Sequence, residues 1–520
     1  MGTAPTQNSP ADSQAGIISF LATGGVLGVE WPKQIDTHAA SVFLCQGRAF
    51  KLKRAVRLGY LDFSTCERRR AALEAELQFN RRTAPDLYLG LRAIRRAADG
   101  TLRIDWSGDG QGDVVDWLLE MRRFPDGALL DDLAARGPLD PALLVRLAAR
   151  VFAFHAEAAV SQGSGAAAFR AVIEGNAESM AAFPAILGAG AVRQLTSALL
   201  MQWRAHAPLL DQRSRTGRVR RAHGDLHLAN IAVIDGEPTL FDCLEFSAEL
   251  ATIDLLYDLA FLLMDLWHRG DCTGANIVLN RYLDLSAIDE AGIGLMPMFL
   301  ATRAAIRSHV AAARARHAED PAGCASMARS YLDLAMSLVA PVPARLVAVG
   351  GLSGSGKSTL ARALGGGLGR APGARILRSD VVRKRLAGVE PETRLGAEHY
   401  TPEAGSRVYA TLDGLADAAL GHGAAVILDA TFALPREREA AERLARRTGV
   451  RFDGLWLASS ESRRVKRVLG RRADASDADA GIARSQTDLA IGDLGAWRKL
   501  SAEGSVVATA TAARELLGMT

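Results

Sequence analysis

Lysine is scarce in this sequence of 520 residues, and neither paired cysteines nor long apolar runs occur. The five cysteines, at positions 45, 66, 243, 272 and 324, show no C-x-x-C spacing, which argues against a zinc site and a disulfide framework. No apolar run approaches the roughly 18 residues that a membrane-spanning helix needs. The first residues lack the basic and apolar regions of a secretory signal. These absences predict a cytoplasmic protein with no membrane partner.

An excess of charge of one sign is lacking as well. Lys plus Arg number 62 and Asp plus Glu 58, which gives a formal net charge of +4. A charge this small, on a chain of this length, does not indicate a dominant nucleic-acid surface. Hydrophobic residues make up 49% and charged residues 23% of the chain, which is typical of globular domains with cores of their own.

The few lysines carry information because arginine takes the basic positions almost everywhere else. Seven lysines stand among the 62 basic residues. A lysine supplies a compact point charge on a phosphate, which arginine does not reproduce. Three of the seven, Lys51, Lys53 and Lys357, fall within the two motifs that predict function.

Four segments are expected along the chain. Residues 1–14 are small, polar and proline-bearing, which predicts a disordered tail. Residues 15–340 begin with short β-like runs and continue with helical patterns, which predicts a β-rich lobe followed by a helical lobe. Residues 341–345 end a proline-bearing linker. In 346–520 apolar strands alternate with helices, which predicts a parallel sheet wound by helices. The expected fold class is therefore α/β and α+β.

A phosphate-binding loop is predicted at the start of the last segment, where Gly-Leu-Ser-Gly-Ser-Gly-Lys-Ser fits G-x-x-x-x-G-K-[ST] at every fixed position. The glycines let backbone N–H groups turn towards an anion, and the following helix adds its dipole. Lys357 is expected at the β- and γ-phosphates of ATP, and Ser358 at Mg²⁺. The predicted cradle consists of Gly351, Ser353, Gly354, Ser355, Gly356, Lys357, Ser358 and Thr359.

Two acids follow at predicted strand ends. Asp429 ends the apolar run of residues 426–428 and is expected to hold Mg²⁺ or its water, with a helix cap as the alternative. Asp380 follows the strand at 375–378 and is expected to accept the proton of an attacking hydroxyl. Arg383, one helical turn on, would fix an anionic substrate or the γ-phosphate. The alternative for this pair is an ordinary cap and a surface arginine.

A basic helix is expected near the end of the chain. Arg463, Arg467, Arg471 and Arg472 fall largely on one helical face. In a phosphoryl-transfer enzyme such a helix closes over ATP as a lid, with Arg467 and Arg471 neutralising charge in the transition state. A solvated basic helix is the alternative.

These elements together resemble the P-loop kinases that include polynucleotide 5′-hydroxyl kinase, gluconate kinase and chloramphenicol phosphotransferase. The resemblance is carried by GLSGSGKST, RSDVVRKRLAG, the segment from Tyr400 to Tyr409, VILDATF and RVLGRRADASDAD. It implies ATP-dependent phosphoryl transfer with Asp380 as the base, and it does not identify the acceptor.

A second site is predicted from His-Gly-Asp-Leu-His-Leu-Ala-Asn at residues 223–230, followed by Phe-Asp at 241–242. The spacing is that of a kinase catalytic loop with a metal-binding acid downstream. Asp225 would accept the acceptor hydroxyl's proton, and Asn230 and Asp242 would hold Mg²⁺ against the phosphates.

The β-rich segment supplies expected partners for that loop. Lys51, in Arg-Ala-Phe-Lys, parallels the lysine that holds the α- and β-phosphates, although Lys53 shares its strand face. Glu76 or Glu74, on the next helix, would pair with this lysine. The backbone near Met121 is expected to meet the adenine.

This half resembles the aminoglycoside phosphotransferase-like, or choline-kinase-like, branch of the protein-kinase superfold, over about residues 30–340. It departs from protein kinases in one respect: residues 39–46 contain no glycine, and no G-x-G-x-x-G loop is found there. The whole chain resembles bacterial fusions of such a domain with a P-loop kinase. That resemblance does not imply antibiotic modification.

The sequence therefore predicts two ATP- and Mg²⁺-dependent phosphotransferase sites that act on hydroxyls of small molecules. Three alternatives stay open: an N-terminal pseudokinase that regulates a single P-loop site, a nucleic-acid 5′-hydroxyl kinase, and an antibiotic-modifying enzyme. The acceptors, the oligomeric state and any coupling between the sites are not predicted.

Overall fold

The computed structural model describes residues 10–23, 25–28, 31–37, 39–58, 61–161, 163–245, 247–316, 318–470 and 475–519. The chain forms two compact units. One comprises Met1–Gly137, Ala153–Ser161 and Val219–Asp258, and the other comprises Pro138–Phe152, Gln162–Arg218 and Leu259–Thr520. The second unit holds helices from both expected domains, so the boundary at 341–345 stays a prediction.

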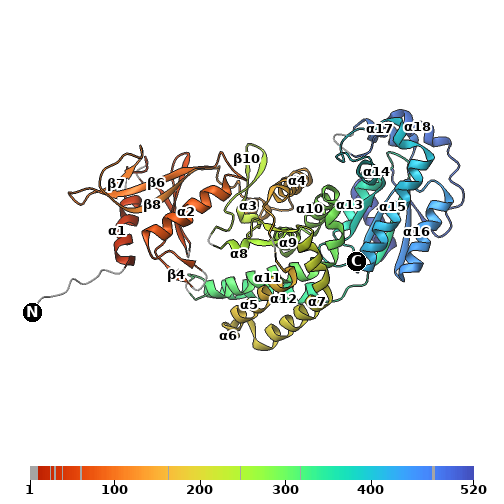
Figure 1. Cartoon of the computed structure of the whole chain (residues 1–520). Helices are drawn as coiled ribbons and strands as arrows, with labels where there is room; N and C mark the ends of the chain where they lie inside the picture. The colour runs from red at the N-terminus through yellow and green to blue at the C-terminus, as the bar shows by residue number, and fades with distance from the viewer. Residues whose placement is uncertain are drawn as a thin grey trace, which may run out of the picture. The chain divides into compact units, whose positions relative to one another are not determined.

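The first unit is built on an antiparallel sheet in the order β1-β2-β3-β8-β6-β7. Figure 1 labels β6, β7 and β8 of this sheet. A hairpin that turns at Asp99-Gly100 joins β6 and β7, and Gly100 has a φ of +85°, which a glycine adopts without strain. The strands are β1 (Lys33–Asp36), β2 (Ala40–Leu44), β3 (Arg48–Lys53), β6 (Tyr88–Arg96), β7 (Leu102–Asp105) and β8 (Asp113–Arg122).

Helices α1 (Pro10–Ala22) and α2 (Cys66–Asn80) cover opposite faces of this sheet. Ile17 and Leu21 of α1 pack with Leu52 and Leu118, whereas Leu73 of α2 packs with Leu119. Adjacent residues of β8 therefore point to opposite cores, as the two-residue period of a strand requires. The same alternation places Lys51 and Lys53 on the α2 side.

The expected N-terminal tail is wrong for residues 10–14, which form the first turns of α1; residues 1–9 lie outside the described residues. The side chain of Gln14 is buried, and its Nε2 donates to the carbonyl of Lys53 at 2.8 Å and to Asp116 Oδ2 at 3.0 Å. Burial against the sheet therefore orders a segment whose own composition favours disorder.

The rest of the first unit supports the predicted catalytic loop. β10 and β11 form a hairpin that turns at Asp235-Gly236. The elements are β4 (Arg57–Leu58), β5 (Leu61–Asp62), α3 (Leu130–Ala134), β9 (Val219–Arg221), η1 (Leu228–Asn230), β10 (Ile231–Ile234), β11 (Glu237–Leu240), α8 (Ala248–Ala251) and β12 (Thr252–Asp254).

A helical region follows in the sequence, as expected. Among the described residues, no helix combines the length and apolar character that crossing a bilayer requires. Its helices are α4 (Pro141–Glu157), α5 (Gly165–Ala181), α6 (Pro184–Leu187), α7 (Ala189–Arg215), α9 (Leu255–His268), α10 (Cys272–Leu285), η2 (Ala287–Leu295), α11 (Met296–Arg314) and α12 (Pro321–Val339).

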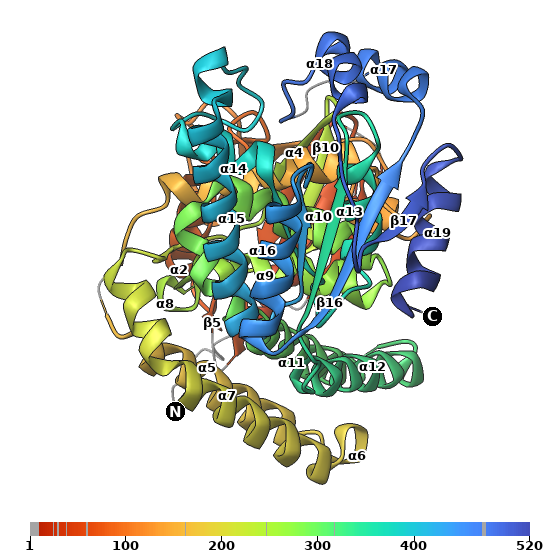
Figure 2. The ribbon, with the colours of Figure 1, turned by 90° about the vertical axis from the view of Figure 1, so that its right-hand side faces the viewer.

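The C-terminal region is a parallel sheet in the order β14-β15-β13-β16-β17. Helices α13 and α19 cover one face, and α15 and α16 the other, which is the near side in Figure 2. The strands are β13 (Arg345–Gly351), β14 (Arg375–Arg378), β15 (Val426–Asp429), β16 (Arg451–Ala458) and β17 (Arg498–Ser501). The helices are α13 (Lys357–Gly365), α14 (Ser379–Leu386), η3 (Ala397–Tyr400), α15 (Pro402–Gly421), α16 (Pro435–Thr448), α17 (Glu461–Leu469), α18 (Ala480–Ser485), η4 (Gln486–Asp488) and α19 (Val506–Leu517).

A buried polar seam joins this sheet to α10 and η2 within the second unit. The guanidinium group of Arg375, on β14, is fully buried and forms ion pairs with Asp284 at 2.9 Å and with Glu290 at 2.6 Å. Asn280 Oδ1 accepts hydrogen bonds from Arg375 and from the Ile376 amide. These ion pairs and hydrogen bonds hold α10 and η2 on the edge strand of the sheet.

Candidate active sites

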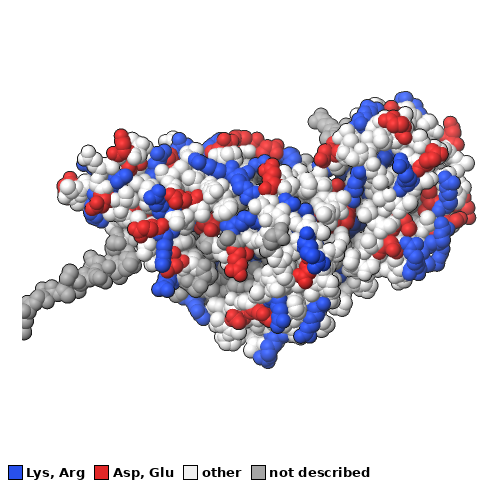
Figure 3. All heavy atoms as spheres, in the orientation of Figure 1, with Lys and Arg blue, Asp and Glu red and all other residues white. Residues whose placement is uncertain are grey.

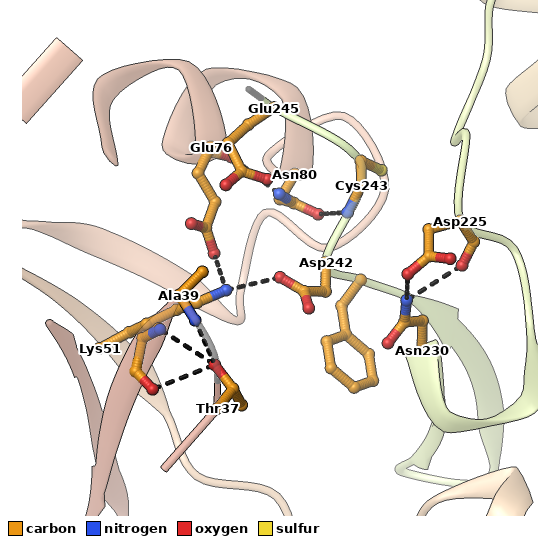
Figure 4. A network of polar contacts seen from close by, with 12 residues as sticks. Thr37, Ala39, Lys51, Glu76, Asn80, Asp225, Asn230, Asp242, Cys243 and Glu245 are labelled. Atoms are coloured by element: carbon orange, nitrogen blue, oxygen red, sulfur yellow. Dashed lines mark hydrogen bonds and ion pairs between the residues drawn. The ribbon is translucent and has the colours of Figure 1, made fainter. Parts of the chain in front are cut away.

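Lys51 lies at the centre of the predicted N-terminal site (Figure 4). Its Nζ donates to Glu76 Oε1 at 2.7 Å and to Asp242 Oδ1 at 2.6 Å. Glu76 is the predicted partner that the structure selects, since Glu74 instead pairs with Arg70 on the exposed face of α2. The two contacts of Lys51 link β3 to α2 and to the segment after β11, which are distant in sequence.

Lys53 makes a second, parallel set of ion pairs. Its Nζ lies 2.7 Å from Glu76 Oε2, and it also contacts Glu245. Burial alone would lower the pKa of Lys51, but the carboxylates of Asp242, Glu76 and Glu245 outweigh it and raise this pKa well above its usual value. Lys51 is thus the lysine that reaches Asp242, and Lys53 is the more deeply buried of the two.

The predicted catalytic loop brings Asp225 and Asn230 together. Asn230 Nδ2 donates to Asp225 Oδ2 at 2.9 Å and to the Asp225 carbonyl at 3.0 Å. His227 Nε2 lies 3.3 Å from Asp225 Oδ2. The Asp225 carboxylate keeps part of its surface exposed, so it is open to a ligand as well as oriented.

The carboxylate of Asp258 anchors the backbone of this loop. Its carboxylate accepts hydrogen bonds from the backbone N–H groups of His223, at 3.1 Å, and Gly224, at 2.8 Å. His155 Nε2 is 3.0 Å from the same carboxylate. The side chains of His155, His223 and Asp258 are all buried, which fits a structural role for His155 and Asp258.

Asp242 occupies an uncommon backbone conformation for a residue with a side chain, with a φ of +60°. Its N–H donates to the Tyr88 hydroxyl at 3.0 Å, and the next amide, of Cys243, donates to Asn80 Oδ1 at 2.9 Å. Burial would raise the pKa of Asp242, but Lys51 and Lys53 hold it below the usual value. The surrounding contacts therefore keep an ionised carboxylate in a strained position, which is typical of functional sites.

The remaining N-terminal predictions concern the nucleotide. The turn between β1 and β2 spans residues 37–39 and contains no glycine; Thr37 Oγ1 instead accepts the Ala40 N–H at 2.9 Å (Figure 4). Met121 lies near the end of β8, opposite Ala49 of β3, where a hinge backbone was expected. Its contact with adenine stays a prediction.

The P-loop connects β13 to α13, as predicted. Gly351, Gly354 and Gly356 have φ values of +143°, +83° and +101°, a region that favours glycine. A Cβ on Gly354 would lie 2.5 Å from the Arg464 carbonyl oxygen, so that position also has no room for a side chain. Ser355 Oγ is buried and has no hydrogen-bond partner among the described residues.

Most of the residues predicted for the P-loop site line one cavity of about 730 Å³. Such a volume suits a nucleotide-sized ligand. The predicted residues that line it are Ser353, Gly354, Ser355, Gly356, Lys357, Ser358, Thr359, Asp380, Arg383, Asp429 and Arg467. Gly351 lies outside this lining, at the end of β13, where it shapes the turn.

The two predicted acids of this cavity lie at the ends of adjacent parallel strands. Asp429 ends β15 and is buried, and Arg378 Nε lies 3.4 Å from its Oδ2. Burial raises the pKa of Asp380, and the nearby Asp429 carboxylate adds to this rise, against the opposing effects of Arg378 and Lys357. A carboxyl group with a raised pKa is a better proton acceptor once ionised.

Arg383 and Tyr400 stack at the edge of this cavity, with the Arg383 guanidinium carbon 4.7 Å from the ring centroid. Arg383 Nη1 donates to the His399 carbonyl at 2.6 Å. The Tyr400 hydroxyl donates to Asp477, which also pairs with Lys384. The segment after α17 is thereby tied to α14 and η3.

The structure describes two of the four arginines of the predicted lid, Arg463 and Arg467. Arg467, on α17, donates to the carbonyl oxygens of Ser355, at 2.9 Å, and Ala502, at 2.7 Å. Arg463 also lines the cavity. Arg471 and Arg472 lie outside the described residues, so the predicted role of Arg471 stays a prediction.

Three contributing residues were not predicted. Glu245 pairs with Lys53, Asp477 joins Lys384 to Tyr400, and the Gln486 side chain accepts the Ser353 N–H at 2.7 Å. Glu245 and Gln486 belong to no motif, and Asp477 lies in the segment RVLGRRADASDAD, where spacing alone assigned it no role. Their proximity to the sites arises only through the fold.

The residues present fit ATP with Mg²⁺. Among the parts of the chain that are described, no cluster of three or more His, Cys, Asp or Glu residues forms a metal site of its own. Mg²⁺ is commonly held by one or two carboxylates together with substrate phosphates, for which Asp429 with Ser358 and Asp242 with Asn230 suffice. The side-chain-free cradle at Gly354 and the unpartnered Ser355 hydroxyl fit a phosphate at the P-loop.

Comparison with known proteins agrees with this geometry. Residues 346–490 match the family described as an AAA domain. The chain is 32% identical, over 461 residues, to the uncharacterized protein Rv2004c of Mycobacterium tuberculosis, and the alignment covers 86% of this chain and 88% of that protein.

Two solved structures bear a likeness in fold. A choline/ethanolamine kinase family protein from Mesorhizobium loti is 14% identical, with a TM-score of 0.38, and covers 62% of this chain and 94% of its own. A gluconokinase from Sinorhizobium meliloti is 18% identical, with a TM-score of 0.26, and covers 34% and 94%. These likenesses assign no residue and no substrate. The family match covers the P-loop, Asp380 and Asp429, and so agrees with the P-loop domain predicted for this part of the chain.

Proposed function

Since the chain belongs to the family of the mycobacterial protein Rv2004c, we propose that it is a phosphotransferase with two ATP sites, each formed by one of the two sets of candidate residues. Each site would move the γ-phosphoryl group of ATP to a hydroxyl of a small molecule with the help of Mg²⁺. The observation that carries the proposal is the completeness of both sets: Lys51, Glu76, Asp225, Asn230 and Asp242 in one, and Lys357, Ser358, Asp380 and Asp429 in the other.

In the N-terminal site, Lys51 would hold the α- and β-phosphates while Glu76 keeps its side chain in place. Asp225 would orient the acceptor hydroxyl and receive its proton, because its carboxylate is open to ligands and fixed by Asn230. Asn230 and Asp242 would hold Mg²⁺, which neutralises the phosphate oxygens when bound with ATP.

In the P-loop site, the backbone N–H groups of the loop and Lys357 would bind the phosphates. Ser358 and Asp429 would hold Mg²⁺ or its water. Asp380 would receive the proton of the acceptor hydroxyl, and its raised pKa supports that role. Arg467 would neutralise charge that develops on the transferred group, and Arg383 would fix an anionic substrate or the γ-phosphate.

The five cysteines all carry free thiols, which fits a reducing compartment such as the cytoplasm. This placement is part of the proposal.

The test is transfer of labelled γ-phosphate from ATP to a pool of small metabolites. Asp225→Asn and Asp380→Asn, made separately in the full chain, are each expected to abolish one set of labelled products and to leave the other. Identical product patterns from wild type and both variants would end the two-site proposal.

A second candidate keeps one catalyst and makes the N-terminal half a pseudokinase that senses a ligand. The glycine-free turn at residues 37–39 favours it. The ion pairs of Lys51 with Glu76 and Asp242 count against it, because they are the pairs that phosphate binding uses. Two results together would support this candidate. The full-chain Lys357→Ala variant would still bind ATP, and Asp225→Asn would abolish no transfer of phosphate.

A nucleic-acid 5′-hydroxyl kinase is less well supported. Basic and acidic side chains are interspersed over the face in Figure 3, and the net charge is +4. Oligonucleotide binding that weakens steeply with salt would be the observation in its favour.

A further inference from the structure

A second cavity, of about 850 Å³, adjoins the phosphate cavity of the P-loop site. It lies between α15 and α16 and is lined by residues of both helices. The residues that the two cavities share are Arg383, Tyr400, Tyr409, Thr431 and Gln486. A molecule in the second cavity would therefore reach the phosphate cavity past Arg383, one helical turn from Asp380.

The charged groups of the second cavity are unequally paired. Arg447 is neutralised by Asp413 at 3.2 Å and Asp417 at 3.0 Å. Glu437 is occupied by a neutral donor, since its Oε2 accepts the Leu434 N–H at 3.2 Å. The acids of this cavity are therefore already satisfied.

Two arginines lack such partners. Arg436, exposed in the first turn of α16, makes no ion pair among the residues described. Arg383 also makes no ion pair with an acid among the described residues. Its Nη1 donates to a carbonyl oxygen, and its Nε is buried and has no hydrogen-bond partner. A buried, unpartnered guanidinium N–H is unfavourable unless a ligand supplies an acceptor. The cavity thus has two guanidinium groups available for an anion.

We propose that this cavity is the acceptor subsite of the P-loop site, and that the acceptor is a hydroxyl compound with a carboxylate or phosphate group held by Arg383 and Arg436. The inference rests on the proposed phosphotransfer at that site and names its substrate class. Arginine suits the role because its planar group binds carboxylate and phosphate with two parallel hydrogen bonds.

The reaction is balanced without a further reactant. The acceptor hydroxyl oxygen forms a bond to the γ-phosphorus, the bond from that phosphorus to the bridging oxygen of ATP breaks, and ADP leaves. The hydroxyl proton passes to Asp380, whose carboxylate lines the phosphate cavity. The anionic group of the acceptor stays in the second cavity and takes no part in bond making.

The test uses the full chain with Asp225→Asn, so that transfer from the N-terminal site does not contribute. The acceptor source is a small-molecule extract separated by anion exchange into an anionic eluate and a neutral and cationic flow-through. Labelled phosphate from ATP is expected in products of the eluate alone. Arg436→Gln is expected to raise the KM for the eluate acceptor at least about tenfold, as loss of a charge-assisted hydrogen bond predicts, whereas Arg436→Lys restores part of the affinity.

The matched control is Arg446→Gln, which removes an arginine of the same helix that does not line the cavity and pairs with Glu442 at 3.8 Å. It should leave the KM unchanged. Transfer to flow-through compounds, or an equal effect of Arg436→Gln and Arg446→Gln, would overturn the anionic subsite while leaving the phosphotransferase in place. If neither fraction is phosphorylated, or if transfer is the same with and without Asp380→Asn, the proposed function of this site fails, and the subsite with it.

Discussion

The ammonium nitrogen of Lys51 lies 2.6 Å from Oδ1 of Asp242, a residue 191 positions further along the chain. The two groups come from β3 and from the segment after β11, so their contact requires the β lobe and the catalytic loop to be folded together. Lys53 faces the same way but contacts Glu245 instead. This difference separates a lysine placed at the expected phosphate position from one that stabilises its surroundings.

Lys51→Met should lower transfer from the N-terminal site by about 10² or more, because it removes a charge that acts on the phosphates. Glu76 would keep one lysine partner, so the fold should survive. The measurement is labelled transfer in an Asp380→Asn background, together with the thermal midpoint of unfolding.

Lys53→Met is the comparison for that variant. It should cost more stability than Lys51→Met, since it leaves buried Glu245 without its ion pair. A larger loss of transfer for Lys53→Met than for Lys51→Met, at temperatures where both remain folded, would reverse the assignment.

Asp258→Ala should destabilise the chain by about 3 kcal/mol, because two buried backbone N–H groups and His155 lose their acceptor. Transfer from the N-terminal site should fall with it, since those N–H groups belong to His223 and Gly224, next to Asp225. Urea unfolding and transfer assays check both effects. Asp86→Ala, at an exposed acid, should change stability by less than about 0.5 kcal/mol; an equal change in the two variants would refute the anchoring role.

Gly354→Ala should weaken nucleotide binding at the P-loop at least about tenfold, because the added Cβ meets the Arg464 carbonyl oxygen and φ is +83°. Gly414→Ala is the matched control: this glycine lies exposed on α15, and nothing lies within 4 Å of its added Cβ. It should stabilise the chain by about 0.5–1 kcal/mol. Titration with an ATP analogue and thermal unfolding measure the two effects, and unchanged binding in Gly354→Ala would contradict the cradle.

His309 should make stability depend on pH. Burial lowers its pKa to about 4 from an ordinary value of 6.5, so the unfolded chain takes up this proton before the folded chain does. The contribution is fully present above about pH 6.5 and is lost as the pH falls towards 4, by up to about 3 kcal/mol. His309→Gln keeps a donor for Asn176 Oδ1 and should remove this part of the acid destabilisation in denaturant unfolding. An unchanged difference between wild type and variant at pH 7 and pH 4.5 would count against it.

The contiguous motifs were the parts of both sites that the sequence could predict. The P-loop and residues 223–230 each place several functional groups within eight consecutive residues. The spacing along the chain was therefore enough to predict which groups act together. Strand and helix positions around them, such as β13 before the loop and α13 after it, follow from apolar runs and glycines.

Other elements depend on tertiary contacts that a local pattern does not contain. α1 is ordered because Ile17 and Leu21, one turn apart, pack on the sheet. β17 has a single buried residue, Leu500, and is a strand because it pairs with β16. Glu245 lies outside the motifs and Asp477 lies within the segment RVLGRRADASDAD, and both were recognised as site residues only through their lysine partners.

The central claim, that one chain holds two ATP sites, is tested most directly by the number of nucleotides bound. Equilibrium titration of the full chain with a non-hydrolysable ATP analogue and Mg²⁺ should give two molecules per chain. Lys51→Met and Lys357→Ala should each reduce this to one, and the double variant to none. A stoichiometry of one in the wild type, abolished by Lys357→Ala and unaffected by Lys51→Met, would contradict the account.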